Sequence, residues 1–243
     1  MDKPRLLVTR FAPDAQRLAN ALNSNGIFAI PQSLLAIEKS AEFNNVSFLF
    51  TNSYDYIIAI SSNAVNYTHQ ALLGSKWPNS HYIAVGKTTQ AVLSKVTGQI
   101  VTAPETLFTS EGVLELSCMK EVVGKRIVIL RGVGGRELLA QKLTARGAMV
   151  EYYQPYQRVA LKLNGKLLVQ EWQQQGINGV IISSGELLQR LLALVPENNI
   201  DWLKTLTIYV PSMRLAEQAH FYGWNHVQVF PGVQDNQILN YFK

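Results

Sequence analysis

Small polar residues and glycines follow several short apolar runs in this sequence, where a bound anion would find hydrogen-bond donors. They stand at Thr9-Arg10, Ser61-Ser62-Asn63, Gly86-Lys87-Thr88, Arg131-Gly132, Ser183-Ser184-Gly185 and Pro211-Ser212. A helical pattern follows each of them, and the free N–H groups and positive dipole end of a helix N-terminus favour anions. Serine and threonine are also ordinary N-caps, which is the stronger interpretation at any single position. Six such ends together favour anion binding.

The apolar runs before these residues have the length of β-strands. We expect strands at Arg5–Val8, Tyr56–Ile60, Tyr82–Val85, Arg126–Leu130, Met149–Tyr153, Gly179–Ile182, Thr207–Val210 and His226–Val229. Amphipathic stretches such as Asp14–Asn23 and Ser212–Tyr222 predict helices between them. This alternation is typical of α/β proteins with parallel sheets. Ligands of such sheets bind beyond the carboxyl ends of the strands, where the polar residues stand.

The two halves of the chain resemble each other. Arg5–Arg10 matches Arg126–Arg131 at an offset of 121 residues, and the same offset relates Gly26 to Gly147, each placed to end a helix. Further along, Ile60-Ser61-Ser62 matches Ile182-Ser183-Ser184. The alternative is that the stretches share only the general pattern of α/β proteins, but their similar order and spacing favour a duplication. A duplicated α/β unit predicts two lobes with a ligand-binding cleft.

Composition narrows the class of protein. The net charge of +5 comes from scattered lysines and arginines, a distribution that disfavours nucleic-acid binding but leaves an anionic small molecule open. Cys118 is the single cysteine, which excludes internal disulfides and cysteine-based metal clusters. No apolar run approaches the roughly 20 residues of a membrane-spanning helix, and the first residues show no signal-peptide pattern. We expect a soluble cytoplasmic protein that does not bind membranes.

Several cofactor motifs are absent from the sequence. Gly132-Val-Gly134-Gly135 follows a predicted strand, but the third glycine of a dinucleotide fingerprint would fall at Glu137. The sequence contains neither a P-loop nor the GxSxG turn of α/β-hydrolases. Its four histidines lack the spacing of a metal-binding pair on one helix face. We therefore expect a protein without cofactor or metal.

A set of short motifs follows a fixed order along the chain: Leu7–Arg10, Ser61–Val65, Ala84–Thr89, Thr109–Leu114, Gly124–Leu139, Ala145–Ala148, Pro155–Arg158, Ser183–Leu188 and Ser212–Ala216. This ordered set resembles the uroporphyrinogen-III synthase family, and especially its gammaproteobacterial members. These motifs span nearly the whole chain, and their order is more specific than any one of them.

The resemblance implies two α/β lobes joined by a two-stranded connector, and it implies that the lobes are not the two sequence halves. The first lobe would contain residues 1–33 and 160–243, the second 38–152, and the connector 34–37 and 153–159. Each lobe would then combine the first unit of one half with the later units of the other. The residues themselves do not distinguish this exchange from a simple tandem. We expect the connector to bend near Ser33–Ile37 and Gln154–Ala160, and the family resemblance suggests a monomer.

The resemblance also implies a reaction, in which hydroxymethylbilane loses water and closes, with inversion of its terminal pyrrole, to uroporphyrinogen III. This substrate is an octacarboxylate, which backbone N–H groups at helix ends could hold. The expected substrate-binding residues are Arg10, Ser61, Ser62, Gly86, Lys87, Thr88, Thr89, Arg131, Gly132, Ser183, Ser184, Ser212 and Arg214. Tyr156 matches the tyrosine after the second lobe's strand and is the candidate to assist the leaving hydroxyl group; alternatively, it only packs in the connector.

A second class of function has the same sequence features. A non-catalytic two-lobed protein that binds an anionic small molecule would need the same strand ends but no acid. Turnover of hydroxymethylbilane would distinguish the two. A nucleic-acid-binding protein, the weakest alternative, would lose affinity steeply with salt.

Overall fold

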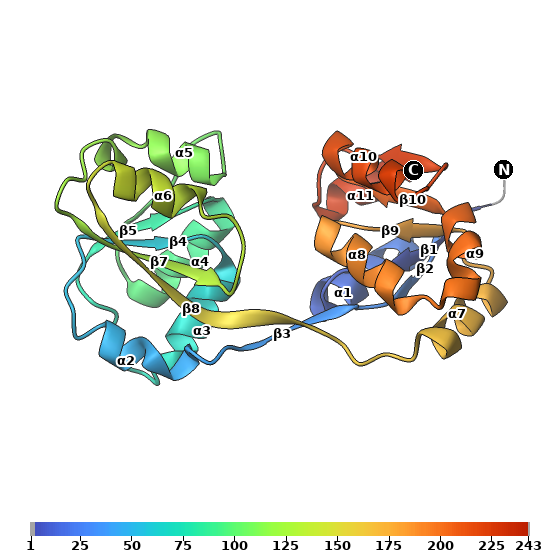
Figure 1. The fold of residues 1–243 in the computed structure, drawn as a ribbon, viewed down its shortest axis with the longest axis horizontal. Helices are drawn as coiled ribbons and strands as arrows, with labels where there is room; N and C mark the ends of the chain where they lie inside the picture. The colour runs from blue at the N-terminus through green and yellow to red at the C-terminus, as the bar shows by residue number, and fades with distance from the viewer. Residues whose placement is uncertain (1–2, 243) are drawn as a thin grey trace. The chain divides into compact units, whose positions relative to one another are not determined.

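The computed structural model describes residues 3–242, and the chain divides into two compact units (Figure 1). Unit 1 comprises Met1–Ala36 and Val159–Lys243, and unit 2 comprises Ile37–Arg158. The first unit is thus built from both ends of the chain, and the second from one continuous segment. The chain passes between them at 36–37 and 158–159, within the segments 34–37 and 153–159 that we expected to form the connector.

Unit 1 contains a sheet of five parallel strands in the order β11-β10-β9-β1-β2. The strands are β1 (Arg5–Val8), β2 (Phe28–Pro31), β9 (Gly179–Ile181), β10 (Thr207–Val210) and β11 (Val227–Val229). Its helices are α1 (Ala12–Ser24), α7 (Gly165–Gln174), α8 (Gly185–Leu194), α9 (Ile200–Thr205), α10 (Met213–Phe221) and α11 (Asp235–Tyr241), with a 3₁₀ turn at Glu197–Asn199. Leu7 packs in the core with α7 to α10, whereas Leu6 and Val8 pack with α1 and α11 on the other face. Side chains that alternate along a strand explain this three-layer arrangement.

Unit 2 contains a six-stranded sheet in the order β3-β8-β7-β4-β5-β6. The strands are β3 (Leu35–Lys39), β4 (Tyr56–Ala59), β5 (His81–Ala84), β6 (Val101–Thr102), β7 (Arg126–Gly132) and β8 (Met149–Ala160). The helices are α2 (Val46–Leu49), α3 (Ser62–Ala71), α4 (Lys87–Thr97), α5 (Ser110–Glu115) and α6 (Leu138–Ala145), with 3₁₀ turns at Phe43–Asn45 and Ser117–Met119. Ile57 faces the core under α3 and α4, and Ile58 faces the core under α5 and α6.

Each sheet combines strands from both halves of the sequence, as the family resemblance implied. β1 pairs with β9 through Leu6 and Gly179, while β7 pairs with β4 through Ile127 and Tyr56. The first strand of each sequence half therefore joins strands of the other half, and residues 1–120 and 121–243 do not form separate sheets. The predicted class, two parallel-sheet α/β lobes with a two-stranded connector, is confirmed.

The connector strands β3 and β8 run antiparallel. Leu161 donates its backbone N–H to Leu34, and Ser40 donates to Pro155, so the two segments pair in opposite directions. The sequence predicts a strand at Met149–Tyr153, followed by a connector segment. Instead β8 continues to Ala160, since Pro155 contributes its carbonyl group, which needs no N–H.

Strands β2 and β6 were not predicted, and β3 was expected only as the connector segment 34–37; each of the three has five residues or fewer. The eight predicted strands are all present, with ends that differ by at most two residues except in β8. Within residues 3–242, no helix combines the length and apolar character needed to cross a membrane.

Candidate functional site

A pocket of about 410 Å³ lies in unit 2 beyond the carboxyl ends of β4, β5 and β7. It is lined by Ile60, Ser61, Val85, Phe108, Thr109, Ser110, Glu111, Arg131, Gly132, Gly134, Gly135, Arg136, Tyr156 and Arg158. Four of these residues, Ser61, Arg131, Gly132 and Tyr156, were predicted to form the site. The strand ends of unit 2 therefore meet where α/β sheets generally bind ligands.

Tyr156 is only 8% exposed, yet it lines the pocket. Its hydroxyl lies 3.1 Å from Oγ of Ser61, and either oxygen can donate. Ser61 is the N-cap of α3 and accepts the N–H of Ala64 at 3.1 Å, so its hydroxyl is held in place. The ring of Tyr156 also packs on Tyr67, with 5.6 Å between centroids. Tyr156 is thus both a packed residue and a hydroxyl at the pocket wall.

Gly132 leaves the space that the Tyr156 ring occupies. A Cβ atom at position 132 would stand 2.6 Å from Cζ of Tyr156 and 3.0 Å from its hydroxyl oxygen. The two residues are register partners between β7 and β8, at a point where the pairing of the strands shifts. Because an aromatic ring cannot bend away, any side chain here would displace Tyr156.

Arg131 is the penultimate residue of β7, and its side chain is 2% exposed. Its guanidinium donates to the carbonyl oxygens of Gly132 (3.3 Å), Gly134 and Arg136 (3.3 Å). These three residues belong to the loop 132–137, which connects β7 to α6. The arginine therefore lies inside a turn of its own chain.

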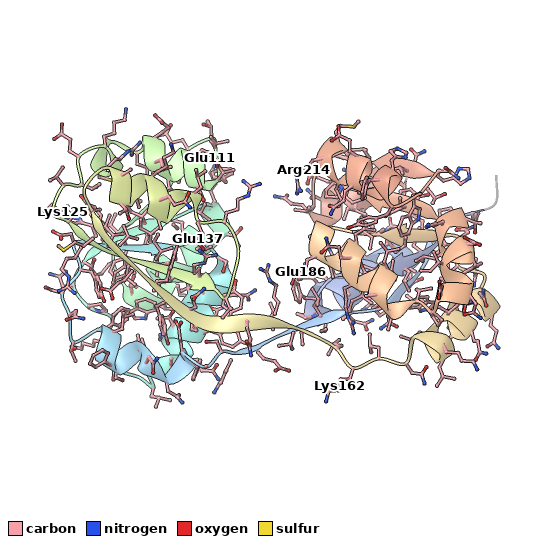
Figure 2. The ribbon with its side chains drawn as sticks, viewed as in Figure 1. Glu111, Lys125, Glu137, Lys162, Glu186 and Arg214 are labelled. Atoms are coloured by element: carbon pink, nitrogen blue, oxygen red, sulfur yellow. The ribbon has the colours of Figure 1, made fainter. Side chains whose placement is uncertain are left out.

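Glu137 and Tyr152 complete the surroundings of Arg131. One carboxylate oxygen of Glu137 accepts from Arg131 at 3.0 Å, and the other accepts the hydroxyl of Tyr152 at 2.6 Å. The ring of Tyr152 lies under the guanidinium, 4.6 Å from its central carbon. The hydrogen bond from Tyr152, together with the charge of Arg131, holds the pKa of Glu137 below its usual value. Figure 2 shows Glu137 and Lys125 beyond the two ends of β7.

The segment before α5 forms another wall of the pocket. Thr109 caps this helix and accepts the N–H of Gly112 at 3.4 Å. A Cβ atom at Gly112 would stand 1.8 Å from the carbonyl oxygen of Leu107, so only glycine permits this turn. Glu111, labelled in Figure 2, forms an ion pair with Arg136 at 3.9 Å and links the two walls. Its pKa is lowered, first by a backbone hydrogen bond and then by Thr109.

Phe108 connects two predicted residues to the pocket. Its ring is 45% exposed, and the ammonium group of Lys87 lies 5.7 Å from the ring centroid. A Cβ atom at Gly86 would stand 3.3 Å from Cβ of Phe108. Gly86 and Lys87 therefore lie behind Phe108 and are not among the lining residues. Ser62, Thr88 and Thr89 lie in the first turns of α3 and α4, also outside the lining.

In unit 1 the predicted serines cap helices. Ser184 accepts the N–H of Leu187 at 3.3 Å at the start of α8, and Ser212 accepts that of Leu215 at 3.4 Å at the start of α10. The expectation that these serines act as N-caps is confirmed. Ser183 directly precedes the first cap, and Arg214 is exposed on α10 (Figure 2). Ligand contact by these residues stays a prediction.

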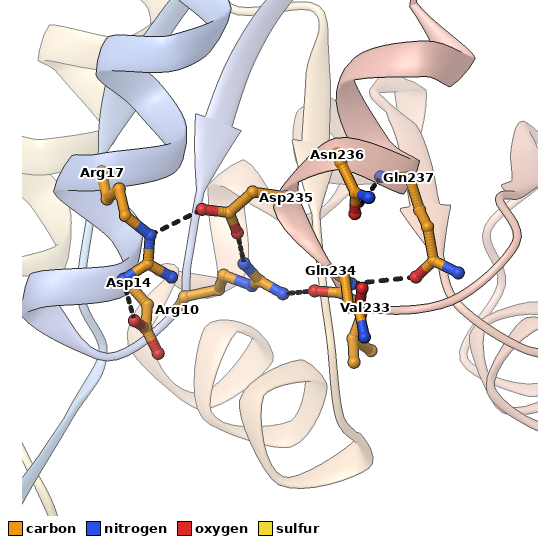
Figure 3. A network of polar contacts seen from close by, with 8 residues as sticks. All are labelled: Arg10, Asp14, Arg17, Val233, Gln234, Asp235, Asn236 and Gln237. Carbon is orange, nitrogen blue, oxygen red and sulfur yellow. Dashed lines mark hydrogen bonds and ion pairs between the residues drawn. The ribbon is translucent and has the colours of Figure 1, made fainter. Parts of the chain in front are cut away.

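Arg10 is engaged in a network within unit 1 (Figure 3). It donates to Oδ1 of Asp235 at 2.6 Å and to the carbonyl oxygen of Val233. Asp235 also accepts from Nε of Arg17 at 2.7 Å. Partial burial alone would raise the pKa of Asp235, but its hydrogen bonds with Arg17 and Arg10 lower it. The network ties the end of β1 to the start of α11.

Sequence reasoning missed part of the pocket wall. The missed residues are Ile60, Val85, Phe108, Thr109, Ser110, Glu111, Gly134, Gly135, Arg136 and Arg158. The motif at Thr109–Leu114 was a usable signal, but the strand before it, β6, has only two residues and did not mark a strand end. Among residues 3–242, no group of three or more His, Cys, Asp or Glu residues could hold a metal ion.

The matching family and the relatives similar to this chain carry the same name. The family described as "Uroporphyrinogen-III synthase HemD" matches residues 16–237. The uroporphyrinogen-III synthases of Salmonella typhimurium and Escherichia coli are 34% and 33% identical to this chain over 240 residues, which is 96% of this chain and 98% of each relative.

Solved structures share the fold at low sequence identity. A mutant uroporphyrinogen III synthase from Thermus thermophilus aligns with a TM-score of 0.66 and 14% identity over 98% of this chain and 97% of its own. The uroporphyrinogen-III synthetase of Helicobacter pylori aligns with a TM-score of 0.63 and 13% identity over the same shares.

Proposed function

This chain belongs to the uroporphyrinogen-III synthase family, and we propose that it closes hydroxymethylbilane into uroporphyrinogen III with loss of water. The family places it in haem biosynthesis as an enzyme that acts on a small tetrapyrrole, so the non-catalytic anion binder is not favoured. Within this function, we propose that the reaction is a cyclising hydro-lyase reaction, carried out by a monomer in the cytoplasm without a cofactor. Sedimentation of the purified chain would test the monomer.

The proposed chemistry begins at the hydroxymethyl group. The electron-rich pyrrole nitrogen helps expel the hydroxyl group, and a proton donor turns that poor leaving group into water. The substituted α-carbon of the terminal ring attacks the resulting azafulvenium cation and forms a spiro intermediate. The bond that joined the terminal ring to its neighbour then breaks, which gives a second azafulvenium cation. Attack on this cation by the other α-carbon of the terminal ring closes the macrocycle with that ring inverted. A C–H proton is lost when the closed pyrrole becomes aromatic again, which returns the proton to the donor. Positioning of the terminal ring is the larger catalytic contribution, because the uncatalysed closure gives the wrong isomer.

We propose Tyr156 as the proton donor. The observation that supports this role is a phenol at the wall of a polar pocket, held by Ser61 at 3.1 Å and by the space at Gly132. Ser61 is itself fixed by its cap bond to Ala64. When Ser61 donates in this pair, the hydroxyl hydrogen of Tyr156 is left to point at a ligand in the pocket. A preorganised donor of this kind fits a reaction that needs little acid strength.

The substrate carboxylates would be held by strand ends and helix N-termini. In unit 2 we propose Ser61, Ser62, Gly86, Lys87, Thr88, Thr89 and Gly132, and in unit 1 Arg10, Ser183, Ser184, Ser212 and Arg214. The exposed cations Lys87 and Arg214 and the capped starts of α3, α8 and α10 support this set. Arg131 is the remaining residue of the predicted set, but its donors are already engaged by its own chain.

The direct test is to incubate the purified chain with freshly made hydroxymethylbilane and separate type I from type III product. We expect type III to form faster than the spontaneous type I. Formation of type I alone, at the uncatalysed rate, would exclude the proposed function.

The variant Tyr156→Phe tests whether the Tyr156 hydroxyl is the proton donor. We expect slower type III formation, by up to about 100-fold, in a protein that stays folded, because a single hydroxyl is lost. Tyr153→Phe is the matched control: this buried tyrosine donates to the carbonyl of Phe43 at 2.7 Å and does not line the pocket. An unchanged rate for Tyr156→Phe at saturating substrate would remove Tyr156 from this role and leave Ser183, Ser184, Thr89 or a water molecule as candidates.

A further inference from the structure

We infer that Arg131 is a positioning residue, which shapes the loop 132–137 at the pocket wall and does not bind substrate. An arginine has five N–H donors. Four of those on Arg131 are engaged, with the carbonyl oxygens of Gly132, Gly134 and Arg136 and with the carboxylate of Glu137. The side chain is 2% exposed, and Tyr152 covers one face of the guanidinium. A substrate carboxylate would have to displace these partners to reach it.

The contacts of Arg131 set the direction of the loop's peptide groups. In a trans peptide the N–H points opposite to the preceding C=O, and the described chain contains no cis peptide. The carbonyl groups of Gly134 and Arg136 face the guanidinium, so the N–H groups of Gly135 and Glu137 point away from it. The buried cation thus gathers carbonyl oxygens on its own side and leaves donors on the other side of the loop.

Two glycines allow this turn. Gly134 and Gly135 have φ angles of 76° and 100°, which side chains disfavour. A Cβ atom at Gly135 would also stand 2.9 Å from a terminal nitrogen of Arg131. The run Gly132-Val-Gly134-Gly135, which fails as a nucleotide fingerprint, is therefore explained as a chain that wraps around an arginine.

The same loop holds Tyr156. Val133 donates its N–H to the carbonyl oxygen of Tyr156 at 2.8 Å, and Gly132 packs against the tyrosine ring. The carbonyl of Gly132 accepts from Arg131 and also from Gln154, each at 3.3 Å. Arg131 consequently acts on the proposed proton donor through one intervening residue. This step of the inference rests on the proposed function.

Arg131→Lys, in the full chain, is the informative variant. A lysine keeps the charge, but its single ammonium group cannot reach three separated carbonyl groups with the planar fork of an arginine. We expect amide exchange at Val133 to accelerate about tenfold in the substrate-free protein, because the bond to Tyr156 is no longer held. We also expect kcat to fall about tenfold with KM nearly unchanged, and type I product to increase.

Arg146→Lys is the matched control. Arg146 also donates to two backbone carbonyl groups, those of Leu114 (2.8 Å) and Met119 (2.7 Å), but it does not line the pocket. We expect its substitution to leave exchange at Val133 and the isomer ratio unchanged. If Arg131→Lys does not fold, Glu137→Gln, which removes the charge but keeps the shape, should accelerate the same exchange to a smaller degree.

The outcomes separate the two proposals. Unchanged exchange at Val133, or a raised KM with unchanged kcat, would overturn the positioning role and return Arg131 to the substrate-binding residues. Faster exchange in the variant, combined with no type III product from the unsubstituted protein, would support the positioning role and exclude the proposed function.

Discussion

Arg10 and Arg131 occupy equivalent places in the duplicated sequence, yet they hold different parts of the molecule. Arg10 lies two residues after β1, and Arg131 is the penultimate residue of β7. Each is largely buried and donates to one carboxylate, and Arg10 also donates to one backbone carbonyl oxygen and Arg131 to three. The carboxylate partner of Arg10 is 225 residues away, and that of Arg131 is six residues away. One arginine joins distant segments of unit 1, and the other shapes a local loop of unit 2.

The same position of the two similar sequence halves therefore carries an arginine with two different structural roles. In unit 1 the helix α11 brings Asp235 to the strand end, so the arginine fastens the end of the chain. In unit 2 the hydrogen-bond partners of Arg131 come from the following loop, including its acid, Glu137. The residue after the arginine differs accordingly: Phe11 precedes α1 in unit 1, whereas Gly132 leaves room for Tyr156 in unit 2.

The largest effect on stability is expected from Asp235→Ala. This substitution leaves Arg10 and Arg17 without their shared acid, and it should lower the free energy of unfolding by about 2–3 kcal/mol. Urea denaturation provides the measurement. The control is Asp14→Ala, which removes an exposed ion pair with Arg17 and should cost less than about 0.5 kcal/mol. Equal losses for both variants would mean that the Arg10 network does not fasten unit 1.

Gly132→Ala should act on catalysis more than on stability. The new methyl group would collide with the ring of Tyr156 at 2.6 Å, and displacement of the ring should lower kcat about tenfold. Phe11→Ala, at the equivalent place in unit 1, should alter the denaturation midpoint and leave kcat unchanged. The comparison between the two units would be wrong if the two variants changed kcat equally.

Acid should weaken unit 1 through Asp235. Its hydrogen bonds with Arg17 and Arg10 overcome the opposite effect of burial and lower its pKa in the folded state. Its contribution to stability is therefore present above its unfolded pKa of about 4, and is lost as pH falls through the lower folded value. Denaturation midpoints measured between neutral pH and acid should fall less steeply for Asp235→Asn than for the unsubstituted chain. A parallel pH dependence for both would contradict this assignment.

The smallest effect is expected from metal removal. Both arginine networks consist of side chains and backbone groups, and the histidine spacing of the sequence does not suit a metal pair. We expect extensive chelation and dialysis to leave type III formation and the denaturation midpoint unchanged. Loss of activity that an added metal restores would show that the reaction needs a metal.

Local sequence features predicted the elements that consist of uniform apolar runs. β1 and β10 begin and end where predicted: Thr9 follows the apolar run of β1, and Pro211, which lacks the N–H of a ladder, follows β10. β8 was predicted too short. Pro155 has no N–H, but it stays in the strand because the partner strand uses only its carbonyl oxygen, which accepts from Ser40. β6 was missed because two residues do not form a recognisable pattern.

The candidate site was also predicted only in part. The sequence indicated Ser61, Gly132 and Tyr156, which follow strand ends or match a family motif, and these residues line the pocket. It did not indicate that the side chain of Arg131 turns inward, because that direction depends on the path of the following loop. Phe108 and Thr109 were missed because the segment before α5 approaches the pocket through a turn that depends on Gly112.

The exchanged topology also sets an order of events during synthesis. Unit 2 consists of the continuous segment Ile37–Arg158, so it can fold once residue 158 has left the ribosome, before β9 to β11 of unit 1 have been made. β1 and β2 are made first but must wait for β9, whose Gly179 pairs with Leu6. Until then Leu7 lacks the side chains of α7 to α10 that bury it, and Leu6 and Val8 lack α11. Contacts between residues so far apart in the sequence slow folding, so we expect unit 1 to form after unit 2.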